Sequence, residues 1–352
     1  MSTTDDQDVH SELDVARLGR WMDEQGIAGR GEPITSRFIT GGASNELFEI
    51  TRGGLTMALR RPPDVVPNGR NETMVREHRL LAALADTDVP HARAIAGCDD
   101  PSVIGGCFYL MEFVDGWSPI QEGTTWPAPF DDELSARRDL AFELVSGIAK
   151  LSRVDWQARG LAGFGRPDGF HERQVDRWLA HLHGFEFRPI PGIEEAATWL
   201  RAHKPRSYVP GIMHGDYQFA NVMYRHGAPA RLAAIVDWEM ATIGDPLLDL
   251  GWVINGWPDG EPGEGSVSYV DYTGMPTAGE LLSAYAAESG RPVDEIDYYV
   301  ILARFKLAIV LEGGYARVVQ GEADNPKMEM FGDVVLHMAQ KAADLAATTS
   351  LR

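Results

Sequence analysis

An aspartate, an asparagine and a second aspartate stand at spacings that suit phosphoryl transfer. Asp216 precedes Asn221 by five residues, and Asp237 follows the apolar run 232–236. This reaction needs a carboxylate that orients the attacking hydroxyl and accepts its proton, and hard oxygen ligands that hold Mg²⁺ across the phosphates. We assign the first role, that of the catalytic base, to Asp216, and we predict that Asn221 and Asp237 are the metal ligands. ATP is then the expected phosphoryl donor.

Short alternating apolar runs and glycine turns fill residues 34–62 and predict three antiparallel strands. The first turn, at residues 41–45, has two interpretations. It is either an ordinary tight turn or a loop whose backbone N–H groups cover the phosphates of a nucleotide. In the second interpretation Gly42, Ser44 and Asn45 belong to the cofactor-binding residues.

A cation and a carboxylate are predicted beside these phosphates. The third strand ends at Arg60 and Arg61, where kinase-like proteins place a phosphate-binding lysine. Either arginine keeps the charge, although its reach and geometry differ from those of lysine. A helix predicted over residues 72–85 places Glu77 where it can pair with this cation, and a solvated carboxylate is the alternative.

The run 108–116 predicts a buried strand that ends in an exposed turn. It is similar to a hinge at which the backbone of Glu112 and Val114 recognises adenine, with Met111 behind the base. A core strand that ends in a turn is the alternative. Further helices are predicted over residues 13–22, 134–154, 171–183, 279–290, 294–318 and 331–349.

The charge balance excludes two classes of partner. With 32 Lys and Arg against 52 Asp and Glu, the net charge is -20. Nucleic acids and anionic membrane surfaces both reward clustered cations, so we expect neither as a partner. The first residues form no apolar signal core and no run of about 18 apolar residues is present, which predicts a cytoplasmic location. The oligomeric state stays open.

The runs 214–221 (HGDYQFAN) and 235–250 (IVDWEMATIGDPLLDL) resemble the aminoglycoside phosphotransferase family, one of several families with a protein-kinase-like fold. The resemblance covers about residues 35–335 and implies an α+β, two-lobe fold. A five-stranded antiparallel sheet with a helix forms the N-terminal lobe, and the larger C-terminal lobe is mainly helical. We place a tail and helix at 1–30, the nucleotide-binding lobe with its hinge at 31–114, and the catalytic and substrate-binding lobe at 115–352.

The resemblance also implies roles for neighbouring residues. It supports Arg60 and Glu77 as an ion pair on the phosphate side. It places His214 under the loop, where it holds backbone groups, and we predict that Asp245 and Asp249 brace loops by hydrogen bonding or helix capping. Glu239 is either a further metal ligand or a structural or solvated carboxylate.

Three departures from protein kinases predict a small-molecule acceptor. Gly215 replaces the arginine that grips a phosphorylated activation loop, and Trp238 and Glu239 replace a phenylalanine–glycine pair. Only a few residues separate Asp237 from Gly244, which is too short for a peptide-docking segment. A protein kinase is therefore the less favoured alternative. A non-catalytic nucleotide-binding module is another, because arginine stands in the lysine position.

The acceptor itself is left between two classes. Residues 59–63 and 244–252 look most like the branch of the family found beside or fused to acyl-CoA dehydrogenases, which implies a hydroxyl on an acyl-CoA or a similar metabolite. The wider family implies an aminoglycoside, and the acidic balance fits a polycation better. An acidic loop with Asp259, Glu261 and Glu264 is hypothesised to help select the acceptor.

Overall fold

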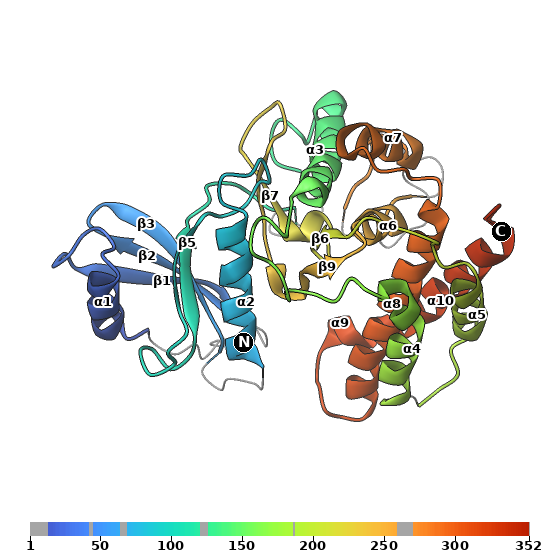
Figure 1. The fold of residues 1–352 in the computed structure, drawn as a ribbon, viewed down its shortest axis with the longest axis horizontal. Coiled ribbons are helices and arrows are strands. Elements are labelled where there is room, and N and C mark those ends of the chain that lie inside the picture. The colour runs from blue at the N-terminus through green and yellow to red at the C-terminus, as the bar shows by residue number, and fades with distance from the viewer. Residues whose placement is uncertain are drawn as a thin grey trace, which may run out of the picture. The chain divides into compact units, whose positions relative to one another are not determined.

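The computed structural model describes residues 13–41, 45–63, 69–119, 126–185, 187–258 and 270–351 (Figure 1). The chain forms two compact units. The first unit comprises Met1–Gly116, Arg159–Leu161 and Ala233–Glu239. The second comprises Trp117–Ala158, Ala162–Leu232 and Met240–Arg352. Asp237 therefore belongs to the first unit, whereas Asp216 and Asn221 belong to the second.

The first unit is built on a five-stranded antiparallel sheet, which confirms the sheet predicted from the sequence. Its strands lie in the order β1-β2-β3-β5-β4. Their bounds are β1 Ile34–Gly41, β2 Glu46–Arg52, β3 Leu55–Arg61, β4 Ala94–Cys98 and β5 Phe108–Glu112. Strictly alternating burial along β2 shows that one of its faces lies in the core. Gly53 and Gly54, both with positive φ, form the tight turn into β3 that the sequence predicts.

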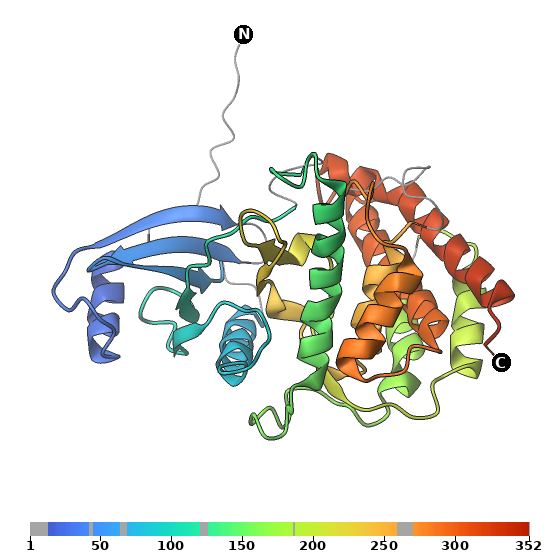
Figure 2. The same ribbon diagram turned by 90° about the horizontal axis from the view of Figure 1, so that it is seen from above.

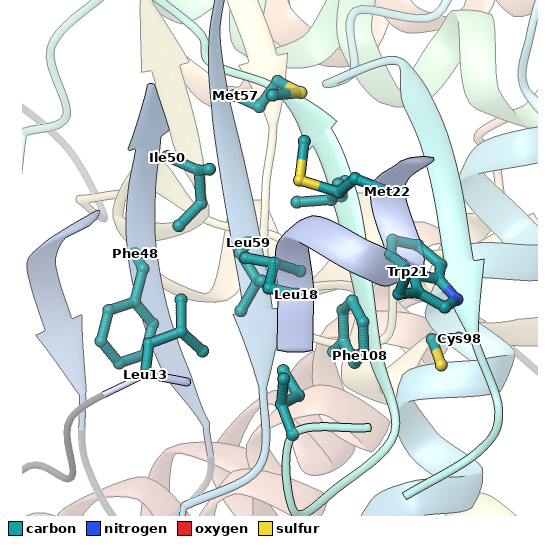
Figure 3. Packing of buried hydrophobic residues seen from close by; sticks show 12 residues of the cluster. Leu13, Leu18, Trp21, Met22, Phe48, Ile50, Met57, Leu59, Cys98 and Phe108 are labelled. Carbon is teal, nitrogen blue, oxygen red and sulfur yellow. The ribbon is translucent and has the colours of Figure 1, made fainter. Parts of the chain in front are cut away.

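Helix α1 (Val15–Glu24) closes the core of this unit (Figure 3). It begins at Asp14, whose carboxylate accepts a hydrogen bond of 2.9 Å from the amide of Arg17. Its buried face presents Leu18, Trp21 and Met22 to the sheet, and the Trp21 ring meets that of Phe108 edge-on at 4.7 Å between centroids. The helix predicted at 13–22 is thus confirmed, and it is part of the sheet's hydrophobic core.

Helix α2 (Arg70–Ala83) begins and ends two residues before the predicted range of 72–85. It starts after Gly69, which has a left-handed φ of 82°, so no side chain caps its first amides. Its buried positions are Met74, Glu77, Leu80 and Leu81, at the spacings of one helix face. The Glu77 carboxylate therefore lies on the buried, otherwise apolar face of α2, where it needs a partner.

The second unit is mainly helical, as predicted (Figure 2). Its helices are α3 Leu134–Arg153, α4 Phe170–His183, α5 Ile193–Ala202, α6 Leu247–Asn255, α7 Ala278–Ser289, α8 Ile296–Val319, α9 Pro326–Glu329 and α10 Phe331–Thr348. Helix α8 is the core element, because it packs against α4, α5, α6 and α10. Helix α3 runs beside α7 in both views. Among the described residues, no helix has the length and apolar character of a membrane-spanning segment.

Four short strands surround the motifs singled out above. Strands β6 (Gly211–Met213) and β9 (Thr242–Gly244) pair antiparallel within the second unit. Strand β7 (Val222–Tyr224) follows the loop with Asp216, and β8 (Leu232–Ile235) precedes Asp237. The sequence indicated the apolar run 232–236, which contains β8, whereas three-residue strands are too short to show alternation.

Candidate active site

The structure brings Asp216 and Asn221 together within the second unit. The side-chain nitrogen of Asn221 donates hydrogen bonds of 2.7 Å to the carbonyl of Asp216 and 2.9 Å to its carboxylate. The side-chain nitrogen of Gln218 donates to the other carboxylate oxygen at 3.0 Å. A 3₁₀ turn, Phe219–Asn221, closes the loop so that the five-residue spacing becomes a direct contact. The Asp216 carboxylate is thus held in place by two amide donors.

Asp249 fixes the backbone on which Asp216 stands. Its carboxylate accepts hydrogen bonds from the amides of His214 at 2.6 Å and Gly215 at 2.8 Å. The buried His214 ring accepts a longer one, 3.3 Å, from the amide of Asp216. The predictions that Asp249 braces the loop and that His214 holds backbone groups are both confirmed. Asp245 also acts as predicted, because its carboxylate accepts from the Leu247 amide at the start of α6.

Gly215 occupies a position that admits no side chain. Its φ is +89°, and a Cβ atom there would lie 2.6 Å from the carbonyl oxygen of Met240. Both the left-handed backbone and the close approach require glycine. An arginine of the protein-kinase type therefore cannot stand here without moving the backbone.

Two tyrosines tie the same loop to α3. The hydroxyl of Tyr217 donates to the carbonyl of Leu144, and that of Tyr224 donates to the carbonyl of Leu140, each at 2.7 Å. Both tyrosines are fully buried. Successive turns of α3 thus hold Tyr217, which follows Asp216 directly, and Tyr224, at the end of β7.

The carboxylate of Asp249 is unusual because of its burial. Burial raises its pKa to about 6, against the opposing effect of the two backbone amides and of Lys306 in α8. The pKa of Lys306 falls to about 8, again through burial, although Asp249 opposes the shift. A buried carboxylate and a buried ammonium therefore interact within the second unit, and the carboxylate is the one that anchors the loop with Asp216.

The first unit holds a second cluster, around Arg60. Its guanidinium lies 3.1 Å from the carboxylate of Glu77 and 2.7 Å from that of Asp237. Glu77 is only 1% exposed, and it also accepts a hydrogen bond of 2.7 Å from the hydroxyl of Tyr109. Arg61 instead pairs with Glu46 at 2.8 Å. The structure thus selects Arg60 over Arg61 as the partner of Glu77, and Glu77 is not a solvated carboxylate.

Arg60 keeps its positive charge in this cluster because of the neighbouring carboxylates. Burial disfavours the charge, but the carboxylates of Glu77 and Asp237 outweigh it and raise the pKa of Arg60 above its usual range. Burial also raises the pKa of Glu77, while the Arg60 guanidinium and the Tyr109 hydroxyl act in the opposite direction. The cluster needs its cation, since an unpaired buried carboxylate is costly. Tyr109 is a member that sequence reasoning missed, because it lies in β5 between Phe108 and Leu110 and all three are buried.

Asp237 has a left-handed backbone, with φ of 62°. Few residues other than glycine adopt this conformation, and aspartate is among those that tolerate it. The turn leaves the Asp237 side chain 41% exposed, next to Arg60. Glu239, two residues on, is held by Arg70 at 2.8 Å and by the side-chain amide of Asn45 at 3.3 Å. These contacts favour the structural role for Glu239 over that of a metal ligand.

The predicted adenine-binding segment lies at the end of β5. Met111 is half-buried, Glu112 is exposed and ends the strand, and Val114 lies beyond it. The amide of Glu112 donates to the carbonyl of Arg93 at 2.9 Å, so this donor is already engaged. Gly42 and Ser44 lie outside the described residues, as do the acidic-loop residues Asp259, Glu261 and Glu264.

The candidate metal ligands have the chemistry that Mg²⁺ prefers. Asn221 makes both of its side-chain hydrogen bonds to Asp216 through its nitrogen, which directs the amide oxygen away from Asp216. Asp237 uses one carboxylate oxygen toward Arg60 and exposes the rest of its side chain. Amide and carboxylate oxygens are hard donors, and Mg²⁺ accepts a few of them together with phosphate and water oxygens. The residues present therefore fit this ion.

Residues 35–286 match the phosphotransferase enzyme family, and the chain belongs to this family. Acyl-CoA dehydrogenase family member 10 of Mus musculus is 30% identical to it over 324 residues, which cover 88% of this chain and 29% of the mouse protein. The chain spans 29% and 41% of the length of the first curated relatives that it matches. This similarity confirms the branch inferred from the sequence.

Solved structures confirm the kinase-like α+β fold. A candidate aminoglycoside phosphotransferase from Ralstonia eutropha has a TM-score of 0.82 and 31% identity, and the match covers 96% of this chain and 99% of that one. A thermostable mutant aminoglycoside phosphotransferase, solved with AMP-PNP and hygromycin B, has a TM-score of 0.52 and 13% identity, with 93% and 100% covered. At this identity the second match shows the shared fold alone.

Proposed function

We propose that this phosphotransferase moves the γ-phosphoryl group of ATP to a hydroxyl of a small molecule. The observation that carries the proposal is the Asp216 carboxylate, which Gln218 and Asn221 hold by amide hydrogen bonds on a loop anchored to Asp249. A fixed carboxylate at this position suits a base that must meet an acceptor hydroxyl in one orientation.

In this mechanism Asp216 accepts the hydroxyl proton as the acceptor oxygen forms its bond to the γ-phosphorus. The bond between that phosphorus and the β–γ bridging oxygen breaks, and ADP leaves. Asn221 and Asp237 would hold Mg²⁺, which neutralises charge on the phosphate oxygens when it is bound. The rest of the catalysis is positioning, because a loose phosphoryl transition state needs little covalent help.

The first unit supplies the groups proposed for the nucleotide. Arg60 would contact the phosphates, and Glu77 would fix its direction, as their 3.1 Å ion pair supports. We further propose that Met111, the Glu112 carbonyl and Val114 contact adenine. Gly42, Ser44 and Asn45 would close over the phosphates.

The acceptor is proposed to be an aminoglycoside or a hydroxyacyl-CoA-type metabolite, and a panel assay tests the function. ADP release would be measured with Mg·ATP and, side by side, kanamycin, hydroxyacyl-CoA thioesters and choline. We expect ADP release that depends on one acceptor class and requires Mg²⁺. A protein that shows neither nucleotide binding nor acceptor-dependent ADP release would contradict the proposal. A thermal shift with ATP and no transfer to any acceptor would favour the non-catalytic module.

Arg60→Ala should destabilise the first unit and weaken ATP binding. The substitution leaves the nearly inaccessible Glu77 carboxylate without its cation, and breaking such a buried pair typically costs about 3–5 kcal/mol. Arg60→Lys keeps a charge and should retain more stability and a lower KM for ATP than the alanine variant. Urea unfolding and the KM for ATP are the measurements.

The matched control for this prediction is Arg37→Ala. Arg37 pairs with Glu49 on the neighbouring strand, but its side chain is 68% exposed, and exposed pairs contribute about 0–1 kcal/mol. Equal loss of stability in the Arg37 and Arg60 variants would show that the Arg60 cluster is not a buried ion pair of this kind.

A further inference from the structure

Lys306 is a buried cation in the middle of the core helix α8. The residue is 8% exposed, and its nitrogen lies 5.3 Å from the ring centroid of Trp178 in α4 and 5.5 Å from that of Trp252 in α6. Within the described part of the chain, this nitrogen makes no hydrogen bond and no ion pair. Two half-buried indoles are its close partners.

This environment leaves the Lys306 charge incompletely satisfied. An ammonium taken out of water needs hydrogen-bond acceptors or a counter-charge, and two indole faces supply only about 0.5–2 kcal/mol each. Asp249 interacts with Lys306 electrostatically, but its carboxylate already receives two backbone amides. Arg177 of α4 adds a second positive charge, which repels the first. Among the described residues no group accepts a hydrogen bond from the Lys306 ammonium, and an anionic group of a ligand would supply such an acceptor.

Lys306 is also linked to the Asp216 loop through α6, because Trp252, beside its ammonium, lies on the same helix as Asp249, which anchors that loop. Its ammonium interacts electrostatically with Asp216 as well as with Asp249. Lys306 lies on α8. Trp178 and Trp252 lie on α4 and α6, which both pack against α8. The result is a cationic centre with aromatic sides, and one of its helices, α6, anchors the loop of the proposed base.

We infer that Lys306 binds a carboxylate or phosphate group of the acceptor, while Trp178 and Trp252 contact its apolar part. The inference rests on the proposed function and narrows its acceptor to an anionic hydroxy compound. A polycationic aminoglycoside is disfavoured at this position, because it has no anionic group to pair with the Lys306 ammonium. The net charge of -20 pointed the other way, but whole-chain charge does not describe the surroundings of one residue.

The test uses matched acceptors that differ in charge. One pair is 3-hydroxybutyrate and its uncharged amide, which probes a carboxylate. The other is 3-hydroxybutyryl-CoA and its pantetheine thioester, which probes the phosphates of the CoA moiety. Lys306→Gln should lower kcat/KM for the anionic member of the responsive pair by about 10- to 100-fold, the usual range for a hydrogen bond to a charged group. The uncharged member should be unaffected, and Lys306→Arg should restore most of the loss.

Lys204→Gln serves as the matched control, since Lys204 is an exposed lysine of the same unit. Thermal unfolding of each variant separates loss of binding from loss of fold. Equal losses for charged and uncharged acceptors in Lys306→Gln would overturn the inference and assign Lys306 a structural role. Turnover confined to kanamycin or to uncharged acceptors would also overturn it, while the proposed function would stand.

Calorimetric titration with 3-hydroxybutyrate and with CoA keeps the inference testable if no acceptor is turned over. Absence of turnover would count against the proposed function alone. Binding of either probe that Lys306→Gln weakens by about 10-fold or more and Lys306→Arg retains would support the anion site. Binding of neither, or binding that ignores the substitution, would contradict it.

The pH dependence provides an independent readout. Lys306 carries its charge below its pKa of about 8 and loses it above, so kcat/KM for the anionic acceptor should fall as the pH rises through about 8. Asp249, Asp216 and Arg177 are the charged groups that face Lys306, and the uncharged acceptor reports their effects. Lys306→Arg should remove the fall, because arginine keeps its proton throughout this range.

Discussion

Asp216→Asn is expected to lower acceptor-dependent phosphoryl transfer by about 10²- to 10⁴-fold, with nucleotide affinity unchanged. Asparagine preserves the size of the side chain but cannot accept the hydroxyl proton. It also replaces one carboxylate oxygen with an NH₂ group. That group then faces the donor nitrogen of Gln218 or Asn221 and cannot accept its hydrogen bond. The variant therefore lacks the base for the acceptor hydroxyl and also one of the hydrogen bonds that orient residue 216. Single-turnover rates with saturating Mg·ATP measure the effect on chemistry, and ADP titration measures binding.

The control for this substitution is Asp139→Asn, at an exposed aspartate of α3 that lies in the same unit. It should leave both rate and affinity unchanged. Transfer by Asp216→Asn at a rate within a few-fold of the parent protein would remove Asp216 from the role of base.

Asp249→Ala should reduce both stability and turnover. The Asp249 side chain is 2% exposed, and its removal leaves the buried amide of His214 and the half-buried amide of Gly215 without acceptors. Each such loss costs about 1–3 kcal/mol. The loop that carries Asp216 would then shift, and a displacement of about 1 Å can cost about 10²-fold in rate. Asp249→Asn retains one acceptor and should lie between the alanine variant and the parent.

Asp245→Asn separates loop positioning from stability alone. Asp245 is equally buried, but its carboxylate contacts His171, Tyr299 and the start of α6, none of which belongs to the Asp216 loop. We expect it to lower the urea midpoint while the folded protein keeps its kcat. If Asp245→Asn and Asp249→Ala reduce kcat alike, the loss in the latter reflects general destabilisation, and Asp249 does not position the loop.

The sequence predicted those parts of the fold and site that depend on local spacing. Alternation and glycine turns gave the first three strands, because a strand with one buried face shows a period of two. Asp216 and Asn221 are five residues apart, so one turn of chain brings them into contact. Glu77 was predicted to pair with a strand cation, and the geometry confirms that pair with Arg60.

The remainder depends on packing between distant segments. Nothing in the spacing of Trp178, Trp252 and Lys306 indicates that three helices bring them together, because each residue taken alone fits an ordinary amphipathic helix. Tyr109 likewise fits an ordinary core residue of a strand in the sequence, and only the structure shows that its hydroxyl donates a hydrogen bond to Glu77. Glu239 could not be assigned from its position beside Asp237, since its partners Asn45 and Arg70 come from the other end of the unit's sequence.

Because Asp237 has a left-handed backbone, selection for stability and selection for phosphoryl transfer should favour different residues at this position. A residue other than glycine in this conformation stores conformational free energy, of the order of 1 kcal/mol, which glycine would release. A library of variants at position 237 selected for thermal stability should therefore become enriched in glycine. A library selected for phosphoryl transfer should retain aspartate, because glycine has no carboxylate and glutamate places its carboxylate one methylene group further from the backbone. The difference between the two enrichments would measure how much stability the family member gives up at this residue for its chemistry.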